Sequence, residues 1–315
     1  MFRLKLIPDN SSFPFLNLFK FGFVFSAILI ALSVGSFLYQ GLNLGIDFKG
    51  GILIEAKSKQ GSADVQRLRA ELGEMSFGEV SIQLFGAEDE VLIRIQKQEG
   101  DEQAQVQVIK EVNALISDGY TVRRTEFVGP TIGAELTQKG ILAVVSALAA
   151  IMIYIWFRFE WQYSIAAILA LSHDVISTIG FFSLTSFEFN LATIAAILTI
   201  AGYSINDTVV VFDRIRENFR RYKSWEQNDI INKSLNETLS RTVMTSVTTA
   251  LALIAIMVFG GPVLRDFAAA MLWGVLIGTY SSIFIAAGVL TYVALNRSGD
   301  DTDLSTRKVW FVLRE

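Results

Sequence analysis

Long apolar runs separated by short polar stretches dominate the chain. Six of these runs are long enough to cross the hydrocarbon core of a bilayer as helices, and charged residues are rare within them. The predicted spans cover residues 21–39, 140–157, 163–184, 191–212, 242–259 and 267–295. This pattern predicts a polytopic α-helical membrane protein with six transmembrane helices, the last five of which form one domain over residues 140–295.

Residues 41–135 show a different pattern, with shorter apolar segments. Strands are predicted over 52–56, 80–85, 91–96 and 121–126, where apolar residues alternate or run together. Helices are predicted over 63–75 and 102–117 from apolar residues at helical spacing. The order β-α-β-β-α-β predicts a small α+β ferredoxin-like domain between the first and second membrane helices. It contains no histidine or cysteine, so we interpret it as a binding or docking domain.

Composition agrees with this division and narrows the chemistry. The 315 residues are 52% hydrophobic and 18% charged, more apolar than a soluble domain requires. Cysteine is absent and His173 is the only histidine, which excludes disulfides, thiolate metal sites and a histidine-rich metal centre. No phosphate-binding Gly-x-x-x-x-Gly-Lys-Ser/Thr loop occurs. We therefore expect no enzyme activity, no metal and no cofactor, and any work done must draw on an external energy source.

Positive charge predicts the orientation. The long connection over residues 213–240 carries several arginines and lysines, and both the N-terminal residues 1–20 and the tail 296–315 also carry basic residues. With six spans these three segments share one side, which the positive-inside rule makes cytoplasmic. The domain over residues 41–135 is then expected on the outer side. The first span is longer than a typical signal-peptide core, which favours a retained helix over a cleaved one.

Asp207 lies inside the fourth predicted span, about five residues or roughly 8 Å from the membrane edge. A charge at that depth costs at least about 3 kcal/mol unless it is paired, protonated or hydrated. Arg241 begins the next span on the same side of the membrane and is the predicted partner. Two interpretations stay open: a static polar clamp that fixes helix packing, or a carboxylate whose protonation changes with conformation.

Asp174 is a second charged residue, near the middle of the third span. It shares a helix face with Ser177 and Thr178, so we expect it to point inward. It is predicted either to relay protons to Asp207 or to make a hydrogen bond that supports packing. His173 is turned about 100° away on a helix, so no His–Asp dyad is expected.

Further polar residues flank the predicted pair. Thr245 and Thr248 share the helix face of Arg241 and are candidates for holding water or supporting a proton path. Asn206 precedes Asp207 directly. Glu188, in the short connection 185–190, is expected in contact with water and without a special role.

Six short motifs stand out in or beside the spans. They are Gly45-Ile-Asp-Phe-Lys-Gly-Gly51, His173-Asp-Val175, Gly202-Tyr-Ser-Ile-Asn-Asp207, Arg214-Ile-Arg-Glu-Asn-Phe219, Arg241-Thr-Val-Met-Thr245 and Phe259-Gly-Gly-Pro-Val-Leu264. In order and spacing, over nearly the whole chain, they resemble the SecF family, the smaller membrane subunits of bacterial SecD–SecF protein-export complexes.

The resemblance implies a place among the proton-driven resistance–nodulation–division transporters. It implies a multi-pass protein of the bacterial inner membrane, with both termini cytoplasmic and the small domain periplasmic. The expected partners are SecD, the SecY–SecE–SecG channel, a translocating preprotein and membrane lipid, with no nucleic acid. Such a complex uses the proton gradient to draw preproteins outward, although some relatives couple to sodium.

The resemblance also assigns residues. The proton-coupling aspartate of the family matches Asp207, and its basic partner matches Arg241. Asp174 is a motif match whose role as relay or polar support stays open. The motif after the first span is likewise matched without a role, through Gly45, Asp47, Gly50 and Gly51.

Three other functions fit parts of the pattern. A small-molecule exporter half of the same superfamily would need a larger substrate-binding outer domain than residues 41–135 provide. A structural assembly subunit without ion coupling would tolerate neutralisation of both Asp207 and Arg241. An intramembrane protease would need two opposed aspartates or a Ser–His pair, which His173 beside Asp174 does not supply.

Overall fold

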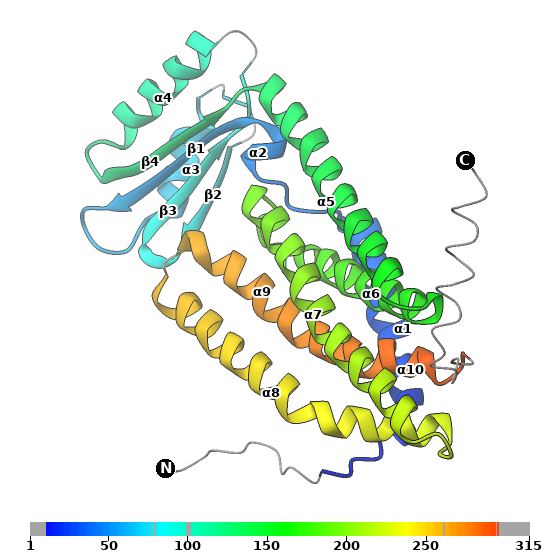
Figure 1. Ribbon diagram of the computed structural model, residues 1–315. Helices are drawn as coiled ribbons and strands as arrows, with labels where there is room; N and C mark the ends of the chain where they lie inside the picture. The colour runs from blue at the N-terminus through cyan, green and yellow to red at the C-terminus, as the bar shows by residue number, and fades with distance from the viewer. Residues whose placement is uncertain are drawn as a thin grey trace, which may run out of the picture.

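The computed structural model describes residues 11–75, 77–78, 80–98, 102–260, 262–293 and 295. A long helical bundle carries a small sheet, covered by helices, at one end (Figure 1). Within the described residues, 6 helices are long and apolar enough to span a membrane. The predicted class, six membrane helices plus a small α+β domain, is therefore confirmed. Residues 1–10 of the predicted N-terminal segment and the predicted tail 296–315 lie outside the described residues, and α1 already begins at Phe15.

The first five membrane helices are longer than the apolar runs that predicted them. Their bounds are α1 Phe15–Gln40, α5 Pro130–Arg158, α6 Trp161–Thr185, α7 Leu191–Arg221 and α8 Gln227–Phe259, followed by α9 Pro262–Ser281, the π-helix η1 Ser282–Ala286 and α10 Ala287–Leu290. In place of the last predicted span, 267–295, three successive helical segments cover residues 262–290. A π-helical turn within a longer helix is rare and is found often at functional sites.

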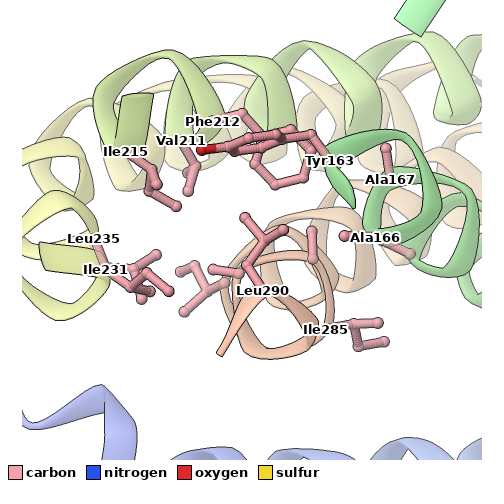
Figure 2. Packing of buried hydrophobic residues seen from close by; sticks show 14 of the residues in the cluster. Tyr163, Ala166, Ala167, Val211, Phe212, Ile215, Ile231, Leu235, Ile285 and Leu290 are labelled. Carbon is pink, nitrogen blue, oxygen red and sulfur yellow. The ribbon is translucent and has the colours of Figure 1, made fainter. Parts of the chain in front are cut away.

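The connection predicted over residues 213–240 is mostly helical, because most of it belongs to α7 and α8. Apolar residues continue at helical spacing through this charged stretch, where Ile215 and Phe219 on α7 and Ile231 and Leu235 on α8 are buried. Figure 2 shows side chains from both helices pointing into one apolar cluster. Burial of this apolar stripe keeps the chain helical beyond the apolar run. A prediction from hydropathy alone therefore makes these two helices too short.

The small domain follows the predicted element order. Its elements are the short helix α2 Ile46–Lys49, then β1 Gly51–Ser58, α3 Val65–Gly73, β2 Val80–Phe85, β3 Ala87–Ile95, α4 Glu102–Ile116 and β4 Tyr120–Val128. The sheet is antiparallel with the order β2-β3-β1-β4, so β3 lies between the two strands that α3 connects. The helix α2 is the one element here that the pattern did not predict.

The two faces of this sheet have different partners. Alternation along β1 sends Ile52 and Ile54 into a core with α3 and α4, where they are fully buried. Leu53, between them, packs on the opposite face with Ile46 of α2 and Leu92 of β3. This second face looks toward the bundle, and a cavity of about 210 Å³ separates it from the ends of α7 and α9. The domain therefore sits over the first turns of α7 and α9.

Candidate ion-coupling site in the helix bundle

Buried polar side chains form a layer across four helices of the bundle. Side chains within a bilayer-spanning bundle find no bulk water, so buried polar groups there bond to one another or to the backbone. The members of this layer, all buried, are Asp174, Ser177, Thr178, Ser204, Asp207, Thr208, Thr242, Ser246, Ser281 and Ser282. They come from α6, α7, α8 and the α9–η1 junction, and two of them are carboxylates.

Close helix packing brings these groups together. A Cβ atom added at Gly274 of α9 would lie 2.3 Å from Ile200 Cγ1, and one added at Gly278 would lie 3.0 Å from Ser204 Cβ. Only glycine permits α9 to approach α7 this closely. The approach places Ser281 and Ser282, just beyond these glycines, against the polar residues of α6 and α7.

Asp207 is held from one side only. Its Oδ1 accepts a hydrogen bond of 2.8 Å from the Thr242 hydroxyl of α8. Its Oδ2 is buried and has no hydrogen-bond partner among the described residues. A buried carboxyl oxygen without a partner is uncommon and calls for an explanation such as a titrating or ion-binding role.

Arg241, the predicted partner of Asp207, makes no ion pair with it in the described part of the chain. Arg241 is exposed, while its neighbour Thr242 is buried and contacts Asp207. Consecutive residues on a helix diverge by about 100°, so turning Thr242 inward turns Arg241 outward. The structure thus places Arg241 near the carboxylate but on the outer face of α8.

The polar residues predicted to flank Asp207 and Arg241 lie on this exposed face as well. Thr245 and Thr248 are exposed, and their hydroxyls donate to backbone carbonyls of α8, at 3.1 Å to Arg241 O and 2.8 Å to Met244 O. Asn206 is exposed as well. None of these three joins the buried layer.

Asp174, in contrast, is fully enclosed, at 0% exposure. Its Oδ2 accepts hydrogen bonds from the hydroxyls of Ser204, at 2.5 Å, and Ser281, at 2.7 Å. The hydroxyls of Ser177 and Thr178 donate to the Asp174 backbone carbonyl, at 3.0 and 2.7 Å. The inward orientation predicted for Asp174 is therefore observed.

The expectation that His173 would not contact Asp174 is wrong. His173 Nδ1 lies 3.0 Å from Asp174 Oδ1, and both residues are buried. The Cα–Cβ bonds of His173 and Asp174 point in different directions. The Nδ1 atom is nevertheless close to the Cβ atom of His173, and the Asp174 side chain is short, so the two groups can still meet. No serine hydroxyl contacts the ring within the described residues; Ser204 and Ser281 bond the carboxylate instead, so this is no Ser–His–Asp triad.

A chain of hydroxyls runs from Asp174 to Thr208, the residue that follows Asp207. Ser282 Oγ lies 2.8 Å from Thr208 Oγ1 and 3.4 Å from the Ser204 carbonyl oxygen. Ser204 in turn bonds Asp174, and Thr208 directly follows Asp207 in α7. The structure brings the two acids into one layer without a direct hydrogen bond between them among the described residues.

The motif after the first span forms a joint between the small domain and α7. Asp47 Oδ2 accepts a bond of 2.8 Å from the backbone N–H of Leu191, the first residue of α7. A carboxylate at a helix N-terminus satisfies a free N–H and favours the helix dipole. Gly50 and Gly51 adopt positive φ, and a Cβ at Gly51 would lie 2.6 Å from Ile95 O. At Gly45, a Cβ would lie 2.5 Å from Glu188 Oε1.

Glu188 is a residue whose role the sequence missed. It is largely buried and pairs with Arg94 of β3, so an ion pair joins the small domain to the loop before α7. Burial raises the pKa of the Glu188 carboxyl above its usual range, while Arg94 acts in the opposite direction. A signal existed in the strand pattern, because Arg94 alternates with buried Ile93 and Ile95 and so faces the bundle.

The described residues contain no group of three or more histidine, cysteine or acidic side chains arranged to hold a metal ion. A carboxylate buried among membrane helices is a group whose protonation state responds to its surroundings. Asp207 is the better placed of the two membrane carboxylates, because it has an oxygen without a partner and adjoins the exposed polar face of α7 and α8.

Comparison with known proteins agrees with the motifs. Residues 107–296 match the family model described as protein export membrane protein SecD/SecF, C-terminal. Residues 36–61 match the SecD/SecF GG motif. Among curated proteins, the protein translocase subunit SecF of Rickettsia bellii is 45% identical over 299 residues, covering 93% of this chain and 97% of that protein. The SecF subunit of Cereibacter sphaeroides is 44% identical, covering 96% of both chains.

Solved structures give the same result. SecDF from Thermus thermophilus, described as a translocon-associated membrane protein, is 38% identical with a TM-score of 0.82 over 91% of this chain. A SecDF structure in a super-membrane-facing form matches with 36% identity and a TM-score of 0.66 over 97% of this chain. This chain spans 39% of the first SecDF chain and 40% of the second.

Proposed function

We propose a function from one premise, that this chain belongs to the SecD/SecF family of protein-export membrane proteins and has a role in protein export. The proposal is that it acts with SecD as an accessory subunit of the Sec translocase and uses the proton-motive force to promote preprotein export across the inner membrane. The SecY–SecE–SecG channel and the preprotein itself are the further partners of this proposal.

The observation that carries the coupling proposal is the one-sided environment of Asp207. One oxygen is bonded to Thr242, and the other is buried without a partner among the described residues. A proton arriving from the outer side would bind this second oxygen and remove the charge. The attraction between Asp207 and Arg241 would then weaken, so α8 could shift against α7. Release of the proton to the cytoplasm would restore the first arrangement.

The exposed face of α7 and α8 supports the pairing with SecD. Asn206, Arg241, Thr245 and Thr248 are exposed in the isolated chain, although they lie on helices that span the membrane. An arginine on a membrane helix is costly against lipid, and such residues normally face protein or water. A second helical subunit that covers this face would enclose the ion path between the two chains.

The energy available sets the scale of the movement. One charge crossing 100 mV supplies about 2.3 kcal/mol, enough to replace a hydrogen bond or two but not to rebuild a helix. The joint formed by Asp47 and the Arg94–Glu188 pair connects the outer end of α7 to the small domain. A tilt of α7 would therefore move the domain that we propose to contact the emerging chain.

The orientation belongs to the same proposal. Arg158, Arg216, Arg220 and Arg221 gather at the end of the bundle opposite the sheet, which the positive-inside rule assigns to the cytoplasm. The small domain is then periplasmic. Accessibility of a cysteine introduced at exposed Lys59 to an impermeant thiol reagent in whole cells tests this, and labelling only after lysis would contradict it.

The deciding experiment measures precursors of exported proteins in cells whose only copy carries Asp207→Asn, at matched membrane abundance. We expect unprocessed precursors to accumulate while the variant still binds SecD. Asp229→Asn, an exposed acid at the start of α8, is the matched control and should process normally. Normal processing in Asp207→Asn, or in a double Asp207→Asn and Arg241→Gln variant, would instead favour a structural subunit without ion coupling.

A further inference from the structure

A basic cavity of about 510 Å³ lies where α5 ends, beside the continuation of α7. The end of α5 that lines it lies away from the sheet (Figure 1). Four arginines and two carboxylates line it: Arg158, Asp213, Arg216, Glu217, Arg220 and Arg221. The lining therefore carries two positive charges in excess, and nothing in the ion-coupling proposal uses them.

The excess charge resides on the arginines of α7. Both oxygens of Asp213 are taken by Arg158, at 2.9 and 3.1 Å, and Glu217 is bonded to Arg214 outside the cavity at 2.8 Å.

By contrast, Arg216, Arg220 and Arg221 form no ion pair with any residue that the structure describes. Arg216 lies over the Phe159 ring at 5.5 Å, which holds its guanidinium at the cavity wall. The three cations are thus presented to whatever enters.

The surroundings identify the depth of the cavity. Arg158 is the last residue of a candidate membrane span. Around it, Trp156, Phe157 and Trp161 are exposed, at 66%, 88% and 58%. Exposed aromatic side chains at a helix end are typical of the membrane–water interface. The cavity therefore opens at the level of lipid headgroups, with an apolar surface directly beside it.

We propose that this cavity binds the headgroup of an anionic phospholipid, with its acyl chains lying along the exposed apolar face of α5. Guanidinium groups bind phosphate oxygens in bidentate geometry, and basic pockets beside membrane helices are suited to anionic headgroups. The excess of two positive charges selects against a zwitterionic lipid, whose own amine would meet the arginines. The adjoining aromatic surface distinguishes a lipid from a free anion.

The test compares lipid retention by the purified full chain in native mass spectrometry, with phosphatidylglycerol or phosphatidylethanolamine added. The cavity variant is Arg216→Gln with Arg220→Gln and Arg221→Gln. The matched control is Lys20→Gln with Lys223→Gln and Lys233→Gln, which removes the same charge outside the cavity lining. We expect the cavity variant to bind phosphatidylglycerol at least about tenfold more weakly, and the control to bind it like the wild type.

Three results would overturn the proposal. Equal loss in both variants would mean that overall charge, and not the cavity, attracts the lipid. Equal retention of the two lipids by the wild type would remove the headgroup selectivity, and full competition by inorganic phosphate would identify a soluble-anion site. The readout is binding, so it is independent of whether Asp207 couples export to protons.

Discussion

Asp174 and Asp207 belong to one polar layer, yet the bundle holds them in different ways. Asp174 has a partner on each oxygen, His173 on one and two serine hydroxyls on the other, and is fully enclosed. Asp207 has a single hydrogen bond, from Thr242, and its other oxygen has none among the described residues. Asp207 also adjoins the exposed face with Arg241, whereas Asp174 is surrounded by α6, α7 and α9.

The difference separates two uses of a buried acid. A fully bonded network fixes one arrangement of helices, because any movement breaks several hydrogen bonds together. Among the described residues, Asp207 has an oxygen without a partner and lies near Arg241 but does not pair with it. In the proposed mechanism, its protonation selects between two arrangements of α7 and α8. Under the proposed mechanism, Asp174 holds the bundle together and Asp207 switches it.

The largest effect that tests this contrast is the loss of stability in Asp174→Ala. Removing the carboxylate leaves His173, Ser204 and Ser281, all buried, without their shared partner. We expect destabilisation of about 3 kcal/mol. Unfolding of the purified chain in detergent by a denaturing surfactant measures it. Asp174→Asn, which keeps one acceptor oxygen, should lose less. If Asp207→Asn destabilises the chain as much as Asp174→Ala does, the proposed difference between the two acids is wrong.

A smaller effect is expected from Thr242→Val, which preserves side-chain shape and deletes the hydrogen bond to Asp207. Stability should fall by about 1 kcal/mol. Precursor processing should nevertheless be impaired, because the coupling between α7 and α8 passes through this bond. The control Thr245→Val removes an exposed hydroxyl that bonds only its own helix backbone. Impaired processing in the Thr245 variant alone would move the coupling to the exposed face.

The smallest effect concerns Glu188, a third buried acid, which lies outside the membrane helices and contacts a cation. Because burial raises its pKa in the folded chain, its protonated form is favoured by folding. Its contribution to stability is then full below its ordinary pKa of 4.5 and is lost as pH rises through the raised value.

We therefore expect the Tm of the wild type, relative to Glu188→Gln, to fall as the pH is raised above about 4.5. Differential scanning fluorimetry across this range measures the difference. Glu74→Gln, an exposed acid of the small domain, controls for the change in net charge. A difference that grows with pH would mean that the attraction of Arg94 outweighs burial at this joint.

Much of the architecture follows from local pattern. Long charge-free runs predict the spans because a bilayer excludes unsatisfied polar groups. The alternation in Ile52–Ile54 places one side of the small domain's core on β1, since period alone determines which side chains share a face. Asp207 was recognised for the same reason, because an acid within an apolar run is costly wherever its partner lies.

Contacts between distant segments could not be predicted in this way. Hydropathy ended α7 near Phe212, but packing against α8 extends it to Arg221. The sequence spacing paired Asp207 with Arg241, whereas helix rotation presents Thr242 instead. The partnership of Glu188 with Arg94, separated by 94 positions, depends on how a strand edge meets a helix end.

The sequence by itself thus determined the spans, the order of the elements in the small domain and the identity of the membrane acids. These follow from hydrophobicity and period, which act locally along the chain. Only the tertiary structure decided which oxygen of Asp207 is bonded, that His173 contacts Asp174, and where the arginines of α7 gather beside α5. Those outcomes depend on rotations and approaches of whole helices, which are set by packing on every neighbour at once.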